Sequence, residues 1–165
     1  MKRWVLWFCS ILLAVCILAA AGLVGAEEAA APEMMYEYRL LDSGEAEIIA
    51  YNGNETDVVI PETLEGHSVG SIWENAFRSY FTTSVIIPEG VKAIGNFAFS
   101  WCENLTSVTI PDSVALLGYN PFAGNPNLTE IRVGQDNPVL EIREGVLFHK
   151  QDKSLIWCPA VCLDS

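Results

Sequence analysis

A short string of residues recurs along this chain at a fixed spacing, and this repetition limits what the chain can fold into. The string at 105–111 reads LTSVTIP, and Ile110 within it matches Ile87 on one side and Val133 on the other, each 23 positions away. A fixed period of about 20 to 50 residues is the signature of supersecondary units stacked along one axis. The sequence therefore predicts a repeat solenoid.

Each unit contains one strand-like run. Apolar Val108 and Ile110 alternate with polar Ser107 and Thr109, which is typical of a short strand with one buried face. Proline cannot donate to a ladder and ends the run in three units, at Pro61, Pro88 and Pro111. A unit with one strand and one return path cannot bury its apolar edge alone, so we predict that neighbouring units stack with their strands in a parallel ladder.

The repeats occupy residues 57–133, as one unit of 27 positions followed by two units of 23 positions each. The first unit is longer because additional residues lie between Pro61 and Ile72. The glycine and polar content of the segment Leu64–Val69 indicates a surface loop there.

Both ends of the array carry hairpin patterns. In residues 36–56, two strand-like runs flank Asp42-Ser43-Gly44, and we expect a β-hairpin that caps the first repeat. Residues 134–165 form a divergent terminal repeat, in which the apolar runs 145–149 and 154–158 predict a second hairpin. Residues 27–35 are acidic and alanine-rich, which indicates a flexible leader to the folded part.

Residues 1–26 have the pattern of a secretory signal peptide. Lys2 and Arg3 precede an apolar run from Trp4 to Val24, and the small residues that end at Ala26 predict cleavage after that residue. The alternative is an uncleaved membrane anchor, because a run of this length approaches that needed to span a bilayer. We therefore expect a secreted or cell-surface protein, which contacts the membrane only if the leader is retained.

The charge of the chain excludes some partners. The sequence has 9 basic and 21 acidic side chains, and residues 1–26 contain two of the basic and none of the acidic ones, so the chain after cleavage has a net charge of −14. This sign argues against nucleic acid and anionic lipid as partners. It is also a common means of keeping a protein soluble.

Three cysteines lie outside the leader, and this odd number argues against a disulfide framework. We expect Cys102 to pack in the interior as a small hydrophobic residue. Cys158 and Cys162 could form a local bridge, but they provide too few ligands for a zinc site.

The segment IPEGVKAIGNFAFSWCENLTSVTIP resembles the BspA-type leucine-rich repeats of bacterial surface and secreted proteins. The resemblance extends from Tyr36 to Pro159, with departures at Trp73, where glycine is usual, and at Pro121 and Gly124. It implies a short leucine-rich-repeat array with a parallel β-ladder on its concave face and little regular helix. It also implies a non-enzymatic role in adhesion, through binding of a protein or glycan such as a host surface or matrix molecule.

No catalytic motif accompanies this pattern. His67 and His149 are far apart and lack partner motifs, and the acidic residues are scattered rather than paired. We therefore expect no enzymatic activity, cofactor or metal. Asn104 and Asn127 occur in glycosylation-type triplets, but they are one period apart, so the repeat explains them better.

The candidate binding site consists of strand residues that flank the buried ones and are expected on the concave face: Ser84, Ile86, Ser107, Thr109, Glu130 and Arg132. The alternative is that these are solvated strand positions of a structural spacer or envelope-anchored stalk. For the aromatic residues at unit junctions, we favour packing between repeats over interface anchoring. These residues are Tyr80, Phe81 and Trp101.

Overall fold

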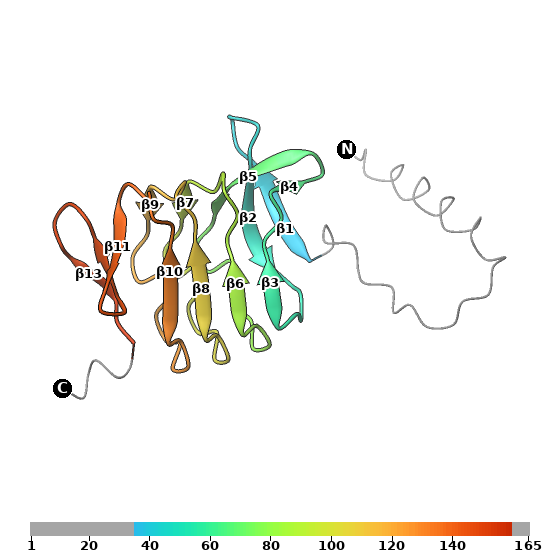
Figure 1. Ribbon diagram of the computed structural model, residues 1–165. Helices are drawn as coiled ribbons and strands as arrows, with labels where there is room; N and C mark the ends of the chain where they lie inside the picture. The colour runs from blue at the N-terminus through green and yellow to red at the C-terminus, as the bar shows by residue number, and fades with distance from the viewer. Residues whose placement is uncertain (1–34, 160–165) are drawn as a thin grey trace, which may run out of the picture.

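The computed structural model describes residues 35–159, which form a β-solenoid (Figure 1). One parallel ladder runs in the order β10-β8-β6-β3. Its strands are β3 (Asp57–Val59), β6 (Ser84–Ile86), β8 (Ser107–Ile110) and β10 (Glu130–Val133). No helix occurs in residues 35–159. The predicted solenoid and its parallel ladder are confirmed.

The repeat sets the register of this ladder. Val108 pairs with Val85 on one side and with Ile131 on the other, so side chains one period apart lie opposite one another. Proline follows three of these strands, at Pro61, Pro88 and Pro111, and ends the rung where the chain turns, whereas β10 is followed by Gly134.

The return path of each unit forms a second ladder, which corrects the expectation of a single strand per unit. Its parallel members are β2 (Ala46–Tyr51), β5 (His67–Ile72), β7 (Ala93–Ile94) and β9 (Leu116–Leu117). Ile72 pairs with Ile94, and Ile94 with Leu117. Strands of two residues are too short to show alternation, but their backbone groups need partners and find them one turn away.

Glycines keep the turns of this second ladder close together. A Cβ atom at Gly95 would lie 2.7 Å from the Glu74 nitrogen, and one at Gly118 would lie 2.4 Å from the Asn96 nitrogen. Trp73 holds the corresponding position in the first unit, where the N-terminal hairpin rather than a repeat lies next to it. The guanidinium carbon of Arg39 lies 4.2 Å from the centre of its ring. The departure from the family pattern at Trp73 therefore has a structural reason.

The core of the solenoid contains a column of aromatic rings, one for each turn. The centroids of Phe77 and Phe99 are 4.7 Å apart, and those of Phe99 and Phe122 are 5.9 Å apart. Tyr51 extends the column at 5.0 Å from Phe77. Cys102 is buried beside it, which confirms the expected hydrophobic role, and burial raises the pKa of its thiol.

At the N-terminal end, β1 (Tyr36–Leu40) pairs antiparallel with β2, as the hairpin pattern predicts. The expected loop at Leu64–Val69 is wrong, because β4 (Thr63–Leu64) pairs antiparallel with β5. Glu65 and Gly66 both have positive φ angles, of 47° and 85°, which is the geometry of a tight hairpin turn. The additional residues of the first unit thus form a second, short hairpin.

At the C-terminal end, a three-stranded antiparallel sheet follows the repeats. Its strands are β11 (Leu140–Arg143), β12 (Val146–His149) and β13 (Leu155–Trp157). The predicted hairpin corresponds to β12 and β13, and β11 is a strand that the sequence pattern did not indicate.

The buried Asn137 side chain joins this sheet to the last full turn. Its amide nitrogen donates to the carbonyls of Pro111 and Val114 at 2.9 and 3.0 Å. Its amide oxygen accepts from the backbone nitrogens of Val139 and Leu140 at 3.0 and 2.8 Å. All four hydrogen bonds of the amide are therefore made in the interior.

The predicted leader at residues 1–26 and the proposed pairing partner Cys162 lie outside the described residues. Over residues 35–159, no helix has the length and apolar character needed to cross a membrane.

Candidate functional site

The six residues expected to form a binding face lie in two rows on the outward side of the ladder β3-β6-β8-β10. We call this surface the strand face. One row is formed by residues at the start of the strands, in the order Asp57, Ser84, Ser107 and Glu130. The second row is formed two positions later, in the order Val59, Ile86, Thr109 and Arg132. The repeat thus brings together residues that come from four different turns of the chain.

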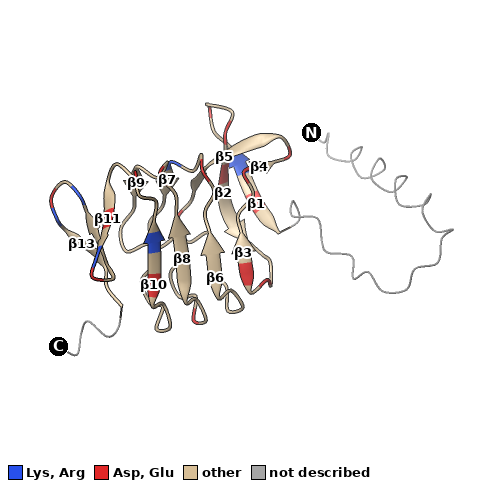
Figure 2. Cartoon of the chain, in the orientation of Figure 1, with Lys and Arg blue, Asp and Glu red and all other residues tan. Residues whose placement is uncertain are grey.

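Charge is confined to the two ends of the strand face, on β3 and β10, and leaves β6 and β8 uncharged (Figure 2). At one end, Arg132 makes two hydrogen bonds to Glu130, at 2.8 and 2.7 Å, so the two charges offset each other. At the other end, the Ser84 hydroxyl donates to Asp57 at 2.5 Å. The middle of the surface, on β6 and β8, therefore carries no charge.

Two apolar side chains project from this surface and remain largely uncovered in the described part of the chain. The exposed fraction is 63% for Val59 and 45% for Ile86, and these residues are directly opposite each other in the ladder. Sequence reasoning missed Asp57 and Val59 as members of the face. They lie 27 rather than 23 positions before their partners, so the longer first unit would have identified them.

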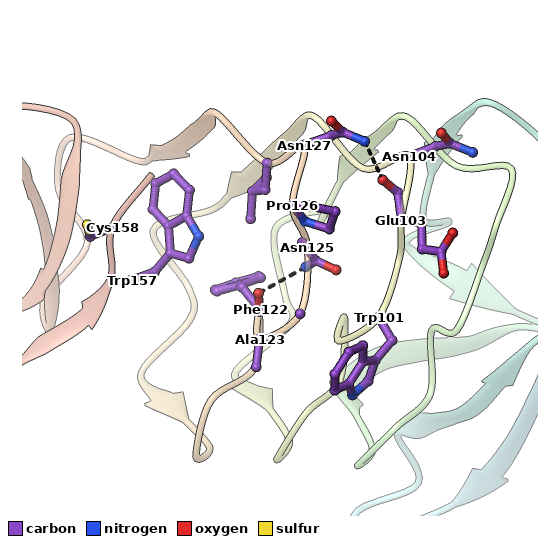
Figure 3. Close-up of a pocket in the computed structure, with 12 residues that line it drawn as sticks. Trp101, Glu103, Asn104, Phe122, Ala123, Asn125, Pro126, Asn127, Trp157 and Cys158 are labelled. Carbon is purple, nitrogen blue, oxygen red and sulfur yellow. Dashed lines mark hydrogen bonds between the residues drawn. The ribbon is translucent and has the colours of Figure 1, made fainter. Parts of the chain in front are cut away.

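A second surface is a groove of about 640 Å³ between the repeats and the terminal sheet. Figure 3 shows Trp101 and Trp157 on opposite sides of this groove, with Phe122 and Pro126 between them. A neighbouring hollow of about 470 Å³ shares Trp101 and Glu103 with it. The groove and this hollow together are called the aromatic groove below.

The aromatic residues at the unit junctions are not buried between the repeats, which differs from the packing that the sequence interpretation favoured, although the Trp101 ring lies against Gly124 of the next unit. The exposed fraction is 62% for Tyr80 and 60% for both Phe81 and Trp101. The phenylalanine column already occupies the interior of each turn, so these side chains remain at the surface.

Asparagine side chains along the aromatic groove hold successive turns together. The amide nitrogen of Asn104 donates to the Tyr80 carbonyl at 2.5 Å, and that of Asn127 to the Glu103 carbonyl at 2.7 Å. The bonds are equivalent because the two residues are one period apart, so each side chain has the role in the repeat that the spacing indicates.

The histidines are not brought together. His67 Nδ1 lies 3.0 Å from the Gly44 carbonyl oxygen in the first unit, whereas His149 lies in β12 at the other end, 3.9 Å from Asp152. No group of three potential metal ligands occurs in the part of the chain that the structure describes.

The stacked turns, the two ladders and the strand face define a leucine-rich-repeat solenoid of the kind that presents a surface for recognition. A model of the BspA type leucine rich repeat region matches residues 51–156, in six copies. The chain belongs to this family. A comparison with curated proteins finds no match.

Solved structures of bacterial leucine-rich repeat proteins are similar to this chain. For a protein from Bacteroides capillosus, the identity is 25%, the match covers 60% of this chain and 94% of that one, and the TM-score is 0.46. For the pneumococcal vaccine antigen PcpA, the identity is 22%, the match covers 74% of this chain and 40% of that one, and the TM-score is 0.47. For a leucine rich cell surface protein from Faecalibacterium prausnitzii, the identity is 18%, the match covers 84% of this chain and 62% of that one, and the TM-score is 0.35.

Proposed function

We propose that this protein is a non-enzymatic module that acts outside the cell and binds a protein ligand through the strand face. The observation that carries the proposal is the alignment of eight outward side chains in two rows, with exposed Val59 and Ile86 at adjacent positions. Membership of the BspA-type family and the leader pattern of residues 1–26 support export.

The physical character of the strand face suits a protein partner. The hydrogen-bonded ladder fixes the backbone from which these side chains project, so little backbone conformational entropy is lost when a ligand binds. Protein interfaces combine an apolar centre with a polar rim. The strand face has both components, since Val59 and Ile86 form an apolar pair on β3 and β6 beside hydroxyl-bearing Ser84 and Thr109, and a charged pair lies on β10.

The test is a binding screen with the full chain recovered after export from a secreting host. Immobilised extracellular matrix proteins and mucin are the first probes, and saturable binding is the expected result. Ile86→Glu places a charge in the apolar pair of Val59 and Ile86, and we expect it to weaken binding by at least about tenfold. Leu116→Glu is the matched control, because Leu116 is an apolar residue that is 67% exposed on the other ladder.

Binding that is lost in Ile86→Glu and kept in Leu116→Glu supports the proposal. Equal loss in both variants argues against the strand face as the site. The absence of saturable binding to any probe favours the alternative, a structural spacer without a specific ligand.

A further inference from the structure

Trp101 is an exposed aromatic residue held in a backbone conformation that bulky L-residues rarely adopt. Its φ angle is 61°, and 60% of the residue is exposed. The equivalent residue one period later is Gly124, with a φ angle of 72°, so the position demands this conformation in both units. Glycine adopts it without strain and tryptophan does not. Strain of this kind is concentrated at ligand sites, where a particular side chain is needed in spite of it.

Gly124 also provides the seat for the Trp101 ring. A Cβ atom at Gly124 would lie 2.8 Å from ring atoms Cδ2 and Cε3 of Trp101. The indole therefore lies directly against the next turn of the solenoid, where only glycine leaves room for it. The result is a rigid aromatic surface that remains open to a ligand.

Further rings continue the aromatic groove on both sides of Trp101. Trp157 lies across the groove (Figure 3). Tyr80 lines the hollow that shares Trp101. The volume of about 640 Å³ lies within the range of small-molecule sites, about 300 to 1,000 Å³. Aromatic rings placed at intervals along a groove suit a chain of sugar rings, whose C–H faces pack on aromatic faces.

Hydrogen-bond acceptors lie next to these rings in fixed positions. Asn104 and Asn127 each use the amide nitrogen to bind the preceding turn, at 2.5 and 2.7 Å, and Figure 3 shows both along the upper rim. The amide oxygens are thereby oriented before a ligand arrives. Such oxygens accept hydrogen bonds from hydroxyl groups, as does the carboxylate of Glu103.

The charge of the groove selects against ionic ligands. Among its lining residues only Glu103 and Arg78 are charged, and their signs are opposite. The rest of the chain is acidic, with a net charge of −12, which disfavours sialylated or sulfated glycans. We propose that the aromatic groove binds a short neutral oligosaccharide, with Trp101 as the central platform. This site is separate from the strand face and does not depend on the protein-binding proposal.

The test is a glycan array with the full exported chain, printed with neutral, sialylated and sulfated oligosaccharides, followed by calorimetric titration with the neutral glycan that binds best. Trp101→Gly installs the residue that the next unit has at this position, so it removes the ring and relieves the backbone strain. We expect this variant to keep its thermal stability and to bind at least about tenfold more weakly.

Gly124→Ala should also weaken glycan binding, because the added carbon displaces the Trp101 ring. Gly44→Ala is the matched control, since Gly44 has a φ angle of 84° and an added Cβ meets no atom within 4 Å. It imposes similar backbone strain without touching the groove, and glycan binding should be unchanged.

Binding restricted to charged glycans, no binding to any neutral glycan, or full binding by Trp101→Gly would overturn the proposal. Binding of a peptide library in place of glycans, with the same loss in Trp101→Gly, would assign the groove to a different ligand and also overturn it. Ile86→Glu should leave glycan binding intact, so the two proposals can fail separately.

Discussion

Replacement of Phe99 by alanine should be among the most destabilising single changes in this chain. Phe99 has no exposed surface and lies in the middle of the aromatic column, with Phe77 at 4.7 Å and Phe122 at 5.9 Å between centroids. Its backbone nitrogen donates to the Pro121 carbonyl at 2.8 Å, and the Phe77 nitrogen donates to the Ala98 carbonyl at 2.8 Å, so backbone hydrogen bonds fix the spacing of the turns on either side. The neighbouring rings therefore cannot move together to fill the cavity that Phe99→Ala would leave.

The magnitude follows from the loss of a large buried ring. Truncation of a core phenylalanine to alanine costs about 3–5 kcal/mol, and two ring contacts are lost at the same time, so we expect about 4–5 kcal/mol for Phe99→Ala. A folded unit of this size has a free energy of unfolding of about 6–19 kcal/mol. The loss would therefore amount to about a quarter of the stability at the upper end of this range and to most of it at the lower end.

The assay is urea unfolding of the full chain, followed by far-UV circular dichroism, with the free energy obtained by linear extrapolation. Phe81→Ala is the control, because the same change at a residue that is 60% exposed should alter the free energy of unfolding by less than about 0.5 kcal/mol. A decrease in the free energy of unfolding of less than about 1.5 kcal/mol for Phe99→Ala, with an unchanged slope against urea concentration, would refute the idea that the aromatic column cannot relax.

Three further outcomes are expected. Asn137→Ala leaves two backbone carbonyls and two backbone nitrogens without partners in the interior, and it should lower the free energy of unfolding by at least about 2–3 kcal/mol, measured in the same urea assay; a loss below about 1 kcal/mol would contradict this. Phe97→Asn should raise the thermal midpoint in calorimetry, because Phe97 has a φ angle of 53° and the equivalent residues of the neighbouring units are Asn75 and Asn120. A lower thermal midpoint would argue against strain at this position. The hydrogen bond from Lys153 and the ion pair with Arg143 hold the pKa of Glu141 below its usual value. The stabilising effect of these contacts is therefore present above the carboxyl's unfolded-state pKa, and it is lost as the pH falls through the lower folded-state pKa. The protection factors of the β11 amides, which compare the exchange rates with the intrinsic rates at the same pH, should fall in that acidic range, and Glu141→Gln should remove this fall.

The main features of the fold could be predicted from the sequence because they repeat. The fixed period set the partners of Val108, the burial of Phe99 and the outward rows that contain Ser107 and Thr109. In a solenoid each turn packs on a copy of itself, so the same side-chain positions meet in every unit. The two terminal hairpins do not repeat, but they could also be predicted because the signals for strands and turns are local. These signals are the turn residues at 42–44 and the apolar runs of residues 145–158.

Other parts of the candidate sites depend on contacts between turns that the sequence pattern does not contain. Strand pairs of two residues, such as Ile94 with Leu117, have no periodicity of their own and exist because the neighbouring turn supplies their hydrogen bonds. Val59 was missed for a different reason: it lies 27 rather than 23 positions before its partner Ile86, a spacing that the length of the first unit already provides.

The sequence by itself determined that the chain stacks into a ladder, which residues fill its core and which strand positions face outward. Only the tertiary structure decided the environment of Trp101, because its exposure depends on what the following turn offers. That turn presents Gly124, which has no side chain, and the terminal sheet beyond it leaves a groove instead of another repeat. A periodic pattern predicts contacts between equal units, whereas the ends of an array and its irregular positions are defined by their actual neighbours.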